Sequence, residues 1–495
     1  MDELIGKLFM IGLPSHEVDD PTKRVLESVK PGSIILFKRN IKSRKQITTF
    51  IESIAKFLGY KPLMAIDQEG GIVTRLTEGF SMAPSAMGLA MSNNPDNAYT
   101  AGRIIGSEMK DVGIDWNLAP VVDINNNSDN PAIGIRSFSN NKDTVIEYAS
   151  KFVLGLKESG VISCLKHFPG NGRVASDPHI DMPVLNVSKA ELYKTELSPF
   201  LSINAPSWMP THIYIPAIQS SKEPITVSKE ILTDMIRGEL GYKGVLLADD
   251  LNMGGVSNFY LPEELAFKTL SAGMDMLSFC DNTTKQIAAK KYLRKKIIQD
   301  KFFLEKIVKS SERIENLFLE RETSNTDKNL SDFSRNRIVM DVISKESVLI
   351  LKNNDNLLPL TGIDNIFAVK ATRLVRVEED IESLPLVVKK AGELLNCPVT
   401  IYRRDLTAEE ADVLLSISNG KRNMIFTENA HLVQRQKIFI EKLADISLSL
   451  VLIALRDPYD ADIMGVKSAI CSYGYNVSQQ EEILNKLINV KYIFN

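Results

Sequence analysis

The stretch GVLLADDL, residues 244–251, is an apolar run that stops abruptly at two acidic residues, Asp249 and Asp250. A buried strand that ends in carboxylates is how α/β enzymes present an acid at the mouth of a parallel sheet or barrel. Aspartates in this position can also cap the helix that follows, because Asp is favoured at a helix N-terminus. The two roles are compatible, so we expect Asp249 to project into the mouth of the sheet or barrel, while Asp250 caps the following helix or braces the neighbouring chain.

Similar apolar runs alternate with amphipathic segments, such as 143–157 and 228–240, through the first 320 residues or so. The predicted strands are SIILF (33–37), LMAID (63–67), IDWNLAP (114–120), VISCLKH (161–167), SWMPTH (207–212), GVLLAD (244–249) and MDMLSF (274–279). This alternation predicts a parallel sheet, either open or closed into a barrel. No GxGxxG follows an early strand, which disfavours a dinucleotide-binding fold.

Residues capable of chemistry recur at the ends of these strands, namely Asp67, Asp123, Lys166, His167, His212, Asp249 and Asp275. Their repeated placement favours a closed (β/α)8 barrel of the TIM type, because the strand ends of such a barrel converge on one face and form the active site there. The N-terminal stretch MDELIGKLFMIGLPS differs, since its short apolar run has helical periodicity and predicts a helix.

The segment KHFPGNGRVASDPH (166–179) places two histidines, a lysine and an aspartate around a Pro-Gly-x-Gly turn. Asp177 and His179 stand two residues apart, so the carboxylate can orient the imidazole and stabilise its charged form. The structural alternative is an Asp–His pair that only braces the loop. Together with Asp249, the pair would suit cleavage of a glycosidic bond, which needs a nucleophile and a proton donor on opposite sides of one sugar carbon.

A polar stretch, RETSNTDKNLSDFSRN (321–336), is typical of a linker. Beyond it, strand-like runs at 347–353, 365–370, 399–404, 423–428 and 448–455 alternate with helical segments. We therefore expect a barrel over residues 1–322, a linker over 323–336 and a smaller α/β sandwich domain over 337–495.

Two features of the second half bear on its role. In LRDPYD, Arg456 and Asp457 fall at a strand end and are candidates for a bridge to the barrel. His431 is the only histidine of this half, and we expect an ordinary surface or core role for it.

Composition excludes several classes of protein. The 495 residues carry a net charge of −3 without a basic, aromatic-rich run, which argues against a nucleic-acid partner. The four cysteines form no CxxC pair and are interpreted as buried free thiols, with Cys164 as a wall residue of the barrel. Neither a membrane-spanning apolar run nor a basic N-terminal region is present, so we expect a cytoplasmic protein.

KHFPG-x-G followed by D-x-H resembles the signature of glycoside hydrolase family 3, in its β-N-acetylglucosaminidase branch. Further segments resemble the family in order along residues 1 to about 320: IDQEGG (66–71), NLAPVVDIN (117–125), IGIRSFS (133–139), THIYIPAI (211–218), ELGYKGVLLADDLNM (239–253) and AGMDMLSFC (272–280). The second half resembles the C-terminal α/β domain of some members, through SVLILKNNDNLLPL and LIALRDPYD.

The resemblance implies a two-step retaining mechanism. Asp249 would attack the anomeric carbon to form a glycosyl-enzyme, and His179, oriented by Asp177, would serve as acid and then as base. The residues that match positions for sugar hydroxyls and the N-acetyl group are Asp67, Arg136, Lys166 and His167. Arg75 and Asp123 match recurrent positions with either a binding or a supporting role.

Several residues depart from the family pattern: Asn171 replaces a histidine, Arg173 and Val174 an Asp-Thr pair, Pro178 a serine, Ile72 an arginine and Ala248 a serine. None of these changes removes a proposed catalytic residue. Pro178 would stiffen the loop. Arg173 would place a cation near the acid/base, where it could meet a lactyl carboxylate or a phosphate, or it is simply a solvated loop charge.

We therefore expect an exo-β-N-acetylglucosaminidase that acts on small peptidoglycan-derived saccharides, needs no cofactor and no metal, and has a small-molecule saccharide as its partner. Three alternatives stay open. The first is a β-N-acetylglucosaminide phosphorylase, because a histidine acid/base does not repel phosphate. The others are a specialised glycosidase of secondary metabolism and a catalytically decayed sugar-binding homologue. No sequence pattern indicates the oligomeric state.

Overall fold

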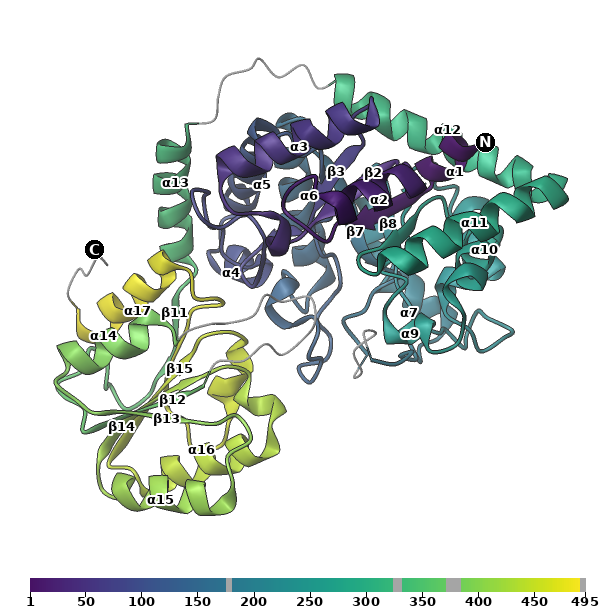
Figure 1. Ribbon diagram of the computed structural model, residues 1–495. Coiled ribbons are helices and arrows are strands. Elements are labelled where there is room, and N and C mark those ends of the chain that lie inside the picture. The colour runs from purple at the N-terminus through teal and green to yellow at the C-terminus, as the bar shows by residue number, and fades with distance from the viewer. Residues whose placement is uncertain (175–179, 324–331, 371–383, 490–495) are drawn as a thin grey trace.

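The computed structural model describes residues 1–174, 180–323, 332–370 and 384–489, which form two domains (Figure 1). The first, purple to teal in the figure, is built on eight parallel strands in the order β10-β1-β2-β3-β6-β7-β8-β9. The strands are β1 (Phe9–Gly12), β2 (Ser33–Leu36), β3 (Leu63–Ile66), β6 (Trp116–Asn117), β7 (Ile162–Phe168), β8 (Ser207–Pro210), β9 (Val245–Leu246) and β10 (Leu277–Phe279).

The sheet closes on itself between its first and last members. A parallel bridge joins Leu247 to Met276, and the Ala248 amide donates to the Met276 carbonyl at 2.9 Å. These bonds link the end of β9 to the start of β10, so no strand of the barrel is left as a free edge. The predicted TIM-type barrel is therefore confirmed.

Helices cover the outside of the barrel: α2 (Asp20–Val29), α3 (Arg44–Leu58), α5 (Pro95–Asp111), α6 (Lys142–Glu158), α7 (Lys189–Lys194), α8 (Ser198–Ser202), the π-helix η4 (Glu230–Glu239), α10 (Pro262–Ala272) and α11 (Thr283–Gln299). Two more, α1 (Asp2–Lys7) and α12 (Lys301–Thr323), pack together (Figure 1). Shorter helices, α4 (Ala86–Met91) and α9 (Gly254–Ser257), lie in the connections.

Helix α6 illustrates how the sequence sets these elements. The Asn141 side chain accepts hydrogen bonds from the backbone amides of Asp143 and Thr144, which caps the helix start. Apolar residues then recur every three or four positions, and Val145 and Phe152 are buried on that face. This pattern produces a helix whose apolar side covers the barrel while its charged side faces water.

The helix predicted for the N-terminal stretch is present as α1, but the prediction is wrong for the apolar residues that follow it. Phe9–Gly12 forms β1, which pairs with both β2 and β10. All four residues are buried because each face of a parallel barrel strand is covered. So short a run therefore shows no period-two alternation, and periodicity alone cannot separate it from a helix.

The second domain, green to yellow in Figure 1, contains a six-stranded sheet in the order β11-β16-β15-β14-β12-β13. The strands are β11 (Leu349–Asn353), β12 (Asn365–Val369), β13 (Val399–Tyr402), β14 (Arg422–Thr427), β15 (Ser449–Ala454) and β16 (Ser468–Cys471). Only β11 is antiparallel to its neighbour, β16. The sequence predicted five of these strands and missed β16.

Helices lie on both faces of this sheet, which confirms the predicted sandwich. Helices α14 (Leu386–Leu394) and α17 (Val477–Ile488) share one apolar cluster with the sheet. Helices α15 (Ala408–Ser418) and α16 (Gln434–Ile446) share the other. This second cluster also contains Met87 and Ile135 of the first domain, so the two domains are joined through a common apolar contact.

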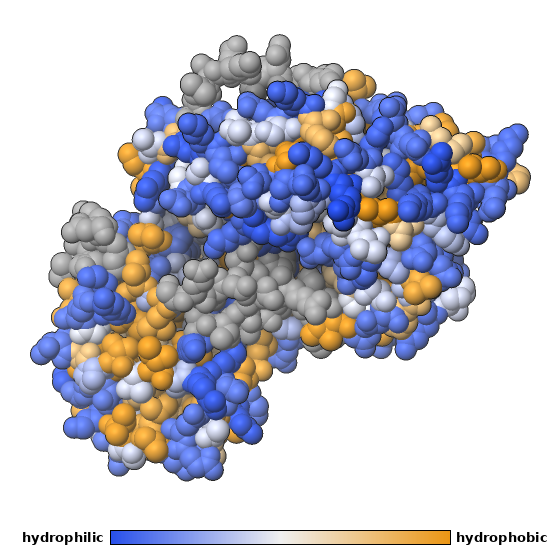
Figure 2. All heavy atoms as spheres, viewed as in Figure 1, coloured by the Kyte–Doolittle hydropathy of each residue, from blue (hydrophilic) through white to orange (hydrophobic). Residues whose placement is uncertain are grey.

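Helix α13 (Phe333–Glu346) adds a further connection, since it packs against α4 and α5 of the barrel and against α17 of the second domain. Polar side chains dominate the visible surface of the barrel, whereas the second domain exposes more apolar ones, as Figure 2 shows. Exposed apolar residues there include Ile401, Val413 and Ile417. Among the described helices, none combines the length and the hydropathy required to cross a bilayer.

Candidate active site

Chemically active side chains gather at the carboxyl end of the barrel. Asp67 directly follows β3, and Lys166 and His167 lie near the end of β7. Thr211 directly follows β8, and Asp249 comes three residues after β9. Since all eight strands are parallel, these positions meet at one face, where the active sites of such barrels form.

Four of the predicted site residues belong to a buried network of charges. The Lys166 ammonium lies 2.8 Å from a carboxylate oxygen of Asp67 and also contacts Glu69. Arg136 grips Glu69 with two hydrogen bonds, of 2.9 Å from Nε and 2.8 Å from a terminal nitrogen. A terminal nitrogen of Arg136 also stands 3.5 Å from His167 Nε2. The structure thus brings Asp67, Arg136, Lys166 and His167 together around Glu69.

The ion pairs within this network shift the pKa values of its members and thereby determine their protonation states. Burial alone would raise the pKa of Glu69, but Arg136 and Lys166 outweigh it and hold that pKa well below its usual range. Burial would likewise lower the pKa of Lys166, yet Asp67 and Glu69 raise it above its ordinary value. At neutral pH the cluster therefore holds a charged ammonium and a charged guanidinium, and groups of this kind are strong donors to hydroxyl and carbonyl oxygens.

Asp123 orients His167. One carboxylate oxygen lies 2.7 Å from His167 Nδ1, and the other accepts hydrogen bonds from the backbone amides of His167 at 3.2 Å and Asn171 at 2.6 Å. A carboxylate only accepts, so Nδ1 carries the proton. In the neutral ring Nε2 is then an acceptor directed toward Arg136. Asp123 thus holds the His167 ring in a fixed orientation through its hydrogen bonds.

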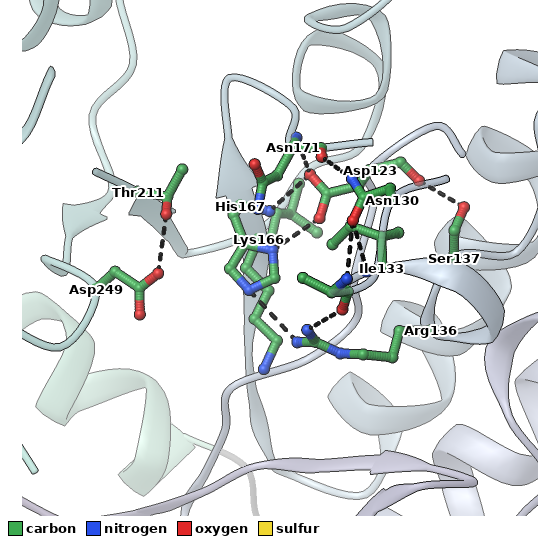
Figure 3. Close-up of polar contacts among 12 residues, drawn as sticks. Asp123, Asn130, Ile133, Arg136, Ser137, Lys166, His167, Asn171, Thr211 and Asp249 are labelled. Carbon is green, nitrogen blue, oxygen red and sulfur yellow. Dashed lines mark hydrogen bonds and ion pairs between the residues drawn. The ribbon is translucent and has the colours of Figure 1, made fainter. Parts of the chain in front are cut away.

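Asp249 stands apart from this network, as Figure 3 shows, with the labelled cluster of Lys166, His167 and Arg136 on the other side of the view. The Thr211 hydroxyl donates to its carboxylate at 3.0 Å. The Asp249 amide donates to the Pro210 carbonyl at 3.1 Å, which ties the residue to β8. Asp249 is thereby held from both its backbone and its side chain.

Asp250 braces the barrel, and it does not cap a helix. One of its carboxylate oxygens accepts from the backbone amides of Cys280 at 3.1 Å and Asn252 at 3.2 Å. Helix α9 starts only at Gly254, with Met253 at its N-cap position. Enclosure of the carboxyl raises the pKa of Asp250 to about 6, and the neighbouring carboxylate of Asp249 adds to that shift.

His212 and Asp275 are strand-end residues with structural roles. The fully buried ring of His212 lies 3.0 Å from the Thr226 hydroxyl and 3.0 Å from the Asp250 carbonyl. Asp275 was expected at the mouth, and this is wrong, because it precedes β10 at the opposite end of the barrel. There it pairs with Arg237 and with Arg313.

Sequence reasoning missed two residues of the site, Glu69 and Thr211. Both lie in segments that carry the family resemblance, IDQEGG and THIYIPAI: Thr211 directly follows β8, and Glu69 comes three residues after β3. That adjacency was the available signal. The proposed acid/base pair, Asp177 and His179, lies outside the described residues, and its assignment stays a prediction.

Comparison with known proteins agrees with this arrangement. The model of the glycosyl hydrolase family 3 N terminal domain matches residues 1–317. The chain belongs to glycosyl hydrolase family 3. A β-hexosaminidase of Tolumonas auensis is 33% identical over 286 residues, which cover 56% of this chain and 84% of that protein. One from Idiomarina loihiensis is 35% identical over 280 residues, covering 55% and 83%.

Among solved structures, the family 3 β-N-acetylglucosaminidase of Paenibacillus sp. str. FPU-7 superposes with a TM-score of 0.88 at 27% identity. The match covers 100% of this chain and 97% of that one, so both domains are shared. The predicted family membership is confirmed, and this family 3 chain is a glycoside hydrolase.

Three of the residues that depart from the family pattern have defined surroundings in the structure. Ile72 packs against the apolar cluster that joins the two domains. Arg173 donates to Glu196 at 2.7 Å and approaches Glu191 of α7 at 3.4 Å, so its charge is compensated by these two carboxylates. Ala248 is buried in the barrel core. Pro178 lies outside the described residues.

The cysteines behave as predicted. All four are buried and free. Burial raises the pKa of Cys164 to about 12, which leaves its thiol protonated at neutral pH. Cys164 is thus a buried wall residue of β7, and its environment disfavours the thiolate form.

Proposed function

We propose that this family 3 protein is a retaining exo-β-N-acetylglucosaminidase that cleaves small, peptidoglycan-derived saccharides through a covalent glycosyl-enzyme. The observation that carries the proposal is the placement of Asp249. Its carboxylate is fixed by Thr211 at the mouth of the barrel and faces a separate cluster of buried donors and acceptors. A nucleophile opposite a sugar-binding wall is what a retaining glycosidase requires.

In the first step, an Asp249 oxygen forms a bond to the anomeric carbon while the bond from that carbon to the leaving oxygen breaks. His179, oriented by Asp177, donates a proton to the leaving oxygen. In the second step, His179 removes a proton from water, and the water oxygen displaces Asp249 from the same carbon. The two displacements restore the original β configuration.

The cluster around Glu69 supports recognition of an amino sugar. Asp67 can accept hydrogen bonds from ring hydroxyls, while Arg136 and Lys166 can donate to hydroxyl oxygens and to an N-acetyl carbonyl. These groups are already oriented by ion pairs within the protein. Little reorganisation is therefore needed when the sugar binds, which favours both affinity and precise placement of C1.

Water is favoured over phosphate as the acceptor. Phosphorolysis would benefit from a free cation near the acid/base, and Arg173 was the candidate for this role. Its guanidinium is instead engaged by Glu196 and Glu191. Incubation in phosphate buffer should therefore give free N-acetylglucosamine, and accumulation of the sugar 1-phosphate would assign the phosphorylase activity instead.

The decisive test is hydrolysis of an aryl β-N-acetylglucosaminide and of a GlcNAc-anhydromuropeptide. Asp249→Asn and His179→Ala should each lower kcat/KM by at least ~10³-fold, whereas Asp143→Asn, at an exposed position on α6, should leave it unchanged. A 5-fluoro glycosyl trap should add its sugar mass to the peptide that contains Asp249. Undiminished hydrolysis in both site variants would sink the assignment.

A further inference from the structure

Among its contacts with the barrel, the second domain makes three polar contacts with the segment of residues 125–135. The side-chain amide of Asn125 donates to the Tyr459 hydroxyl at 2.8 Å, and His431 Nε2 lies 3.1 Å from the Ser128 carbonyl. The third contact is made by Asp457, which accepts from the Ile135 amide at 2.9 Å. This segment connects β6 to α6 and lies between Asp123 and Arg136 of the candidate site.

The Asp457 contact is the one closest to the site. Ile135 belongs to the short helical turn η2 (Gly134–Arg136), so the bonded amide directly precedes Arg136. Asp457 is only 2% exposed, and its own amide donates to the Asn429 side chain at 3.1 Å, which holds the carboxylate in place. The predicted bridge from LRDPYD to the barrel is thus confirmed for Asp457.

Gly134 makes room for this carboxylate. A Cβ atom at Gly134 would lie 2.5 Å from an oxygen of Asp457, closer than any ordinary contact. The backbone at Gly134 also has a φ of 44°, in the left-handed region that favours glycine. The turn and the carboxylate are therefore fitted closely to one another, and a displacement of Asp457 would act on the turn directly.

We propose that Asp457 is a positioning residue for the glycosidase reaction, which sets the Gly134–Arg136 turn so that the Arg136 guanidinium reaches Glu69 and His167. A side chain of the second domain thereby determines the geometry of a sugar-binding residue in the barrel. The kinetic part of this proposal rests on the proposed function, while the structural part does not.

The test compares Asp457→Ala and Asp457→Asn with the wild-type full-length protein. Alanine removes the acceptor for the Ile135 amide, so Arg136 should lose its fixed position and KM for the aryl β-N-acetylglucosaminide should rise about 10-fold, with a smaller effect on kcat. Asparagine keeps an acceptor oxygen of the same reach and should restore most of the affinity.

Asp364→Ala provides the matched control. Asp364 is a carboxylate of the same domain, but its partner, Arg422, also belongs to that domain. This variant should leave KM unchanged. A rise in KM equal to that of Asp457→Ala would show a general effect of domain stability and would overturn the proposal, as would failure of Asp457→Asn to recover affinity.

Hydrogen–deuterium exchange of the peptide that contains Ile135 gives a readout independent of the substrate. Its amide should exchange faster in Asp457→Ala and at nearly the wild-type rate in Asp457→Asn. Unchanged exchange in Asp457→Ala would overturn the positioning role even if activity falls. If the wild-type protein cleaves none of the glycosides, the proposed function fails, and the exchange experiment still decides whether Asp457 holds the turn.

Discussion

Glu69 determines the charge state of the candidate site although it is not among the proposed catalytic residues. It is buried between Arg136 and Lys166 and compensates both cations. A buried cation without a partner would cost several kcal/mol. Glu69 therefore keeps both cations charged inside the candidate site, while Asp67 supplies a carboxylate beside Lys166.

Among the described residues, the Thr211 hydroxyl bonds to Asp249 and not to the cluster around Glu69, so its effect can be measured separately. Thr211→Val removes the hydrogen bond to the carboxylate while preserving the shape of the side chain. We expect kcat to fall about 10-fold with little change in KM, because the carboxylate of Asp249, the proposed nucleophile, loses its orientation before attack. Thr211→Ser keeps the hydroxyl and should retain most of the activity. Steady-state kinetics on the aryl glycoside measure the difference, and equal losses in both variants would contradict this role.

Asp250 should make stability depend on pH. Its pKa is raised from 3.8 to about 6 in the folded protein, so between these values the folded state binds more protons than the unfolded state. The folded state must therefore lose stability as the pH rises through this window. Asp250→Asn keeps the acceptor oxygen but cannot ionise.

The free energies of unfolding should be similar near pH 3.8 for the two proteins, and above about pH 6 the variant should be more stable by about 1–3 kcal/mol. Denaturant titrations at several pH values provide the measurement. A wild-type curve parallel to that of the variant would show that Asp250 does not titrate in this way.

At the scale of elements, the sequence indicated most strands because apolar runs that end in polar residues are characteristic of parallel barrels. It failed at β1 (Phe9–Gly12), which is too short and too thoroughly buried to show a period. From the sequence, Asp275 was expected at the carboxyl end of the barrel. This was wrong because an apolar run alone does not show which of its residues form the strand, and Asp275 precedes β10. Glu69 was missed because its importance comes from partners far away in the chain, Arg136 and Lys166.

The connection after β7 is packed closely against the connection after β6. A Cβ atom on Gly172 would lie 1.8 Å from the Ile124 carbonyl oxygen, so Gly172→Ala must separate the two backbones. We expect a loss of about 1–3 kcal/mol in the free energy of unfolding. We also expect reduced activity, because the Asn171 amide that binds Asp123 would move as well.

Gly238→Ala is the control for this substitution. The nearest atom to a Cβ at that position is the Thr233 carbonyl oxygen at 3.6 Å, an ordinary contact. Alanine should therefore be tolerated in η4 without loss of stability. Denaturant unfolding and glycoside hydrolysis of both variants decide the matter, and equal behaviour would contradict the close packing at Gly172.

At the scale of the whole molecule, the two domains share an apolar cluster and a set of polar contacts. His431 belongs to these polar contacts between the domains, whereas the sequence suggested only an ordinary surface or core role. Its Nδ1 lies 2.7 Å from Asp460, and its Nε2 lies 3.1 Å from the Ser128 carbonyl. Both partners are acceptors, so only the doubly protonated imidazolium can donate to both.

Burial alone would lower the pKa of His431, but the hydrogen bond and charge of Asp460 outweigh it and raise that pKa above 6.5. The contribution of His431 to stability is therefore fully present below pH 6.5 and is lost as the pH rises through the higher pKa of the folded state. His431→Gln should remove this dependence. Thermal unfolding between about pH 5.5 and about pH 8.5 should show the variant's deficit shrinking as the pH rises.

His16→Gln, at a partly exposed histidine of the barrel, is the control for this experiment and should follow the wild-type curve. A deficit of His431→Gln that stays constant over the whole range would mean that the ring acts through packing alone. The same measurement would then assign the pH dependence of the domain contact to other groups.

In each domain the opening strand pairs with the strand that is made last. Strand β1 needs β10, and β11 needs β16. The ribosome synthesises the chain from the N-terminus to the C-terminus. Neither sheet can therefore be completed before nearly all of its domain has been synthesised. Contacts between residues so far apart in the sequence also slow folding, because a long loop must close before they can form. The nascent protein therefore carries an unpaired edge on β1 until Phe279 has emerged, and one on β11 until Cys471 has followed.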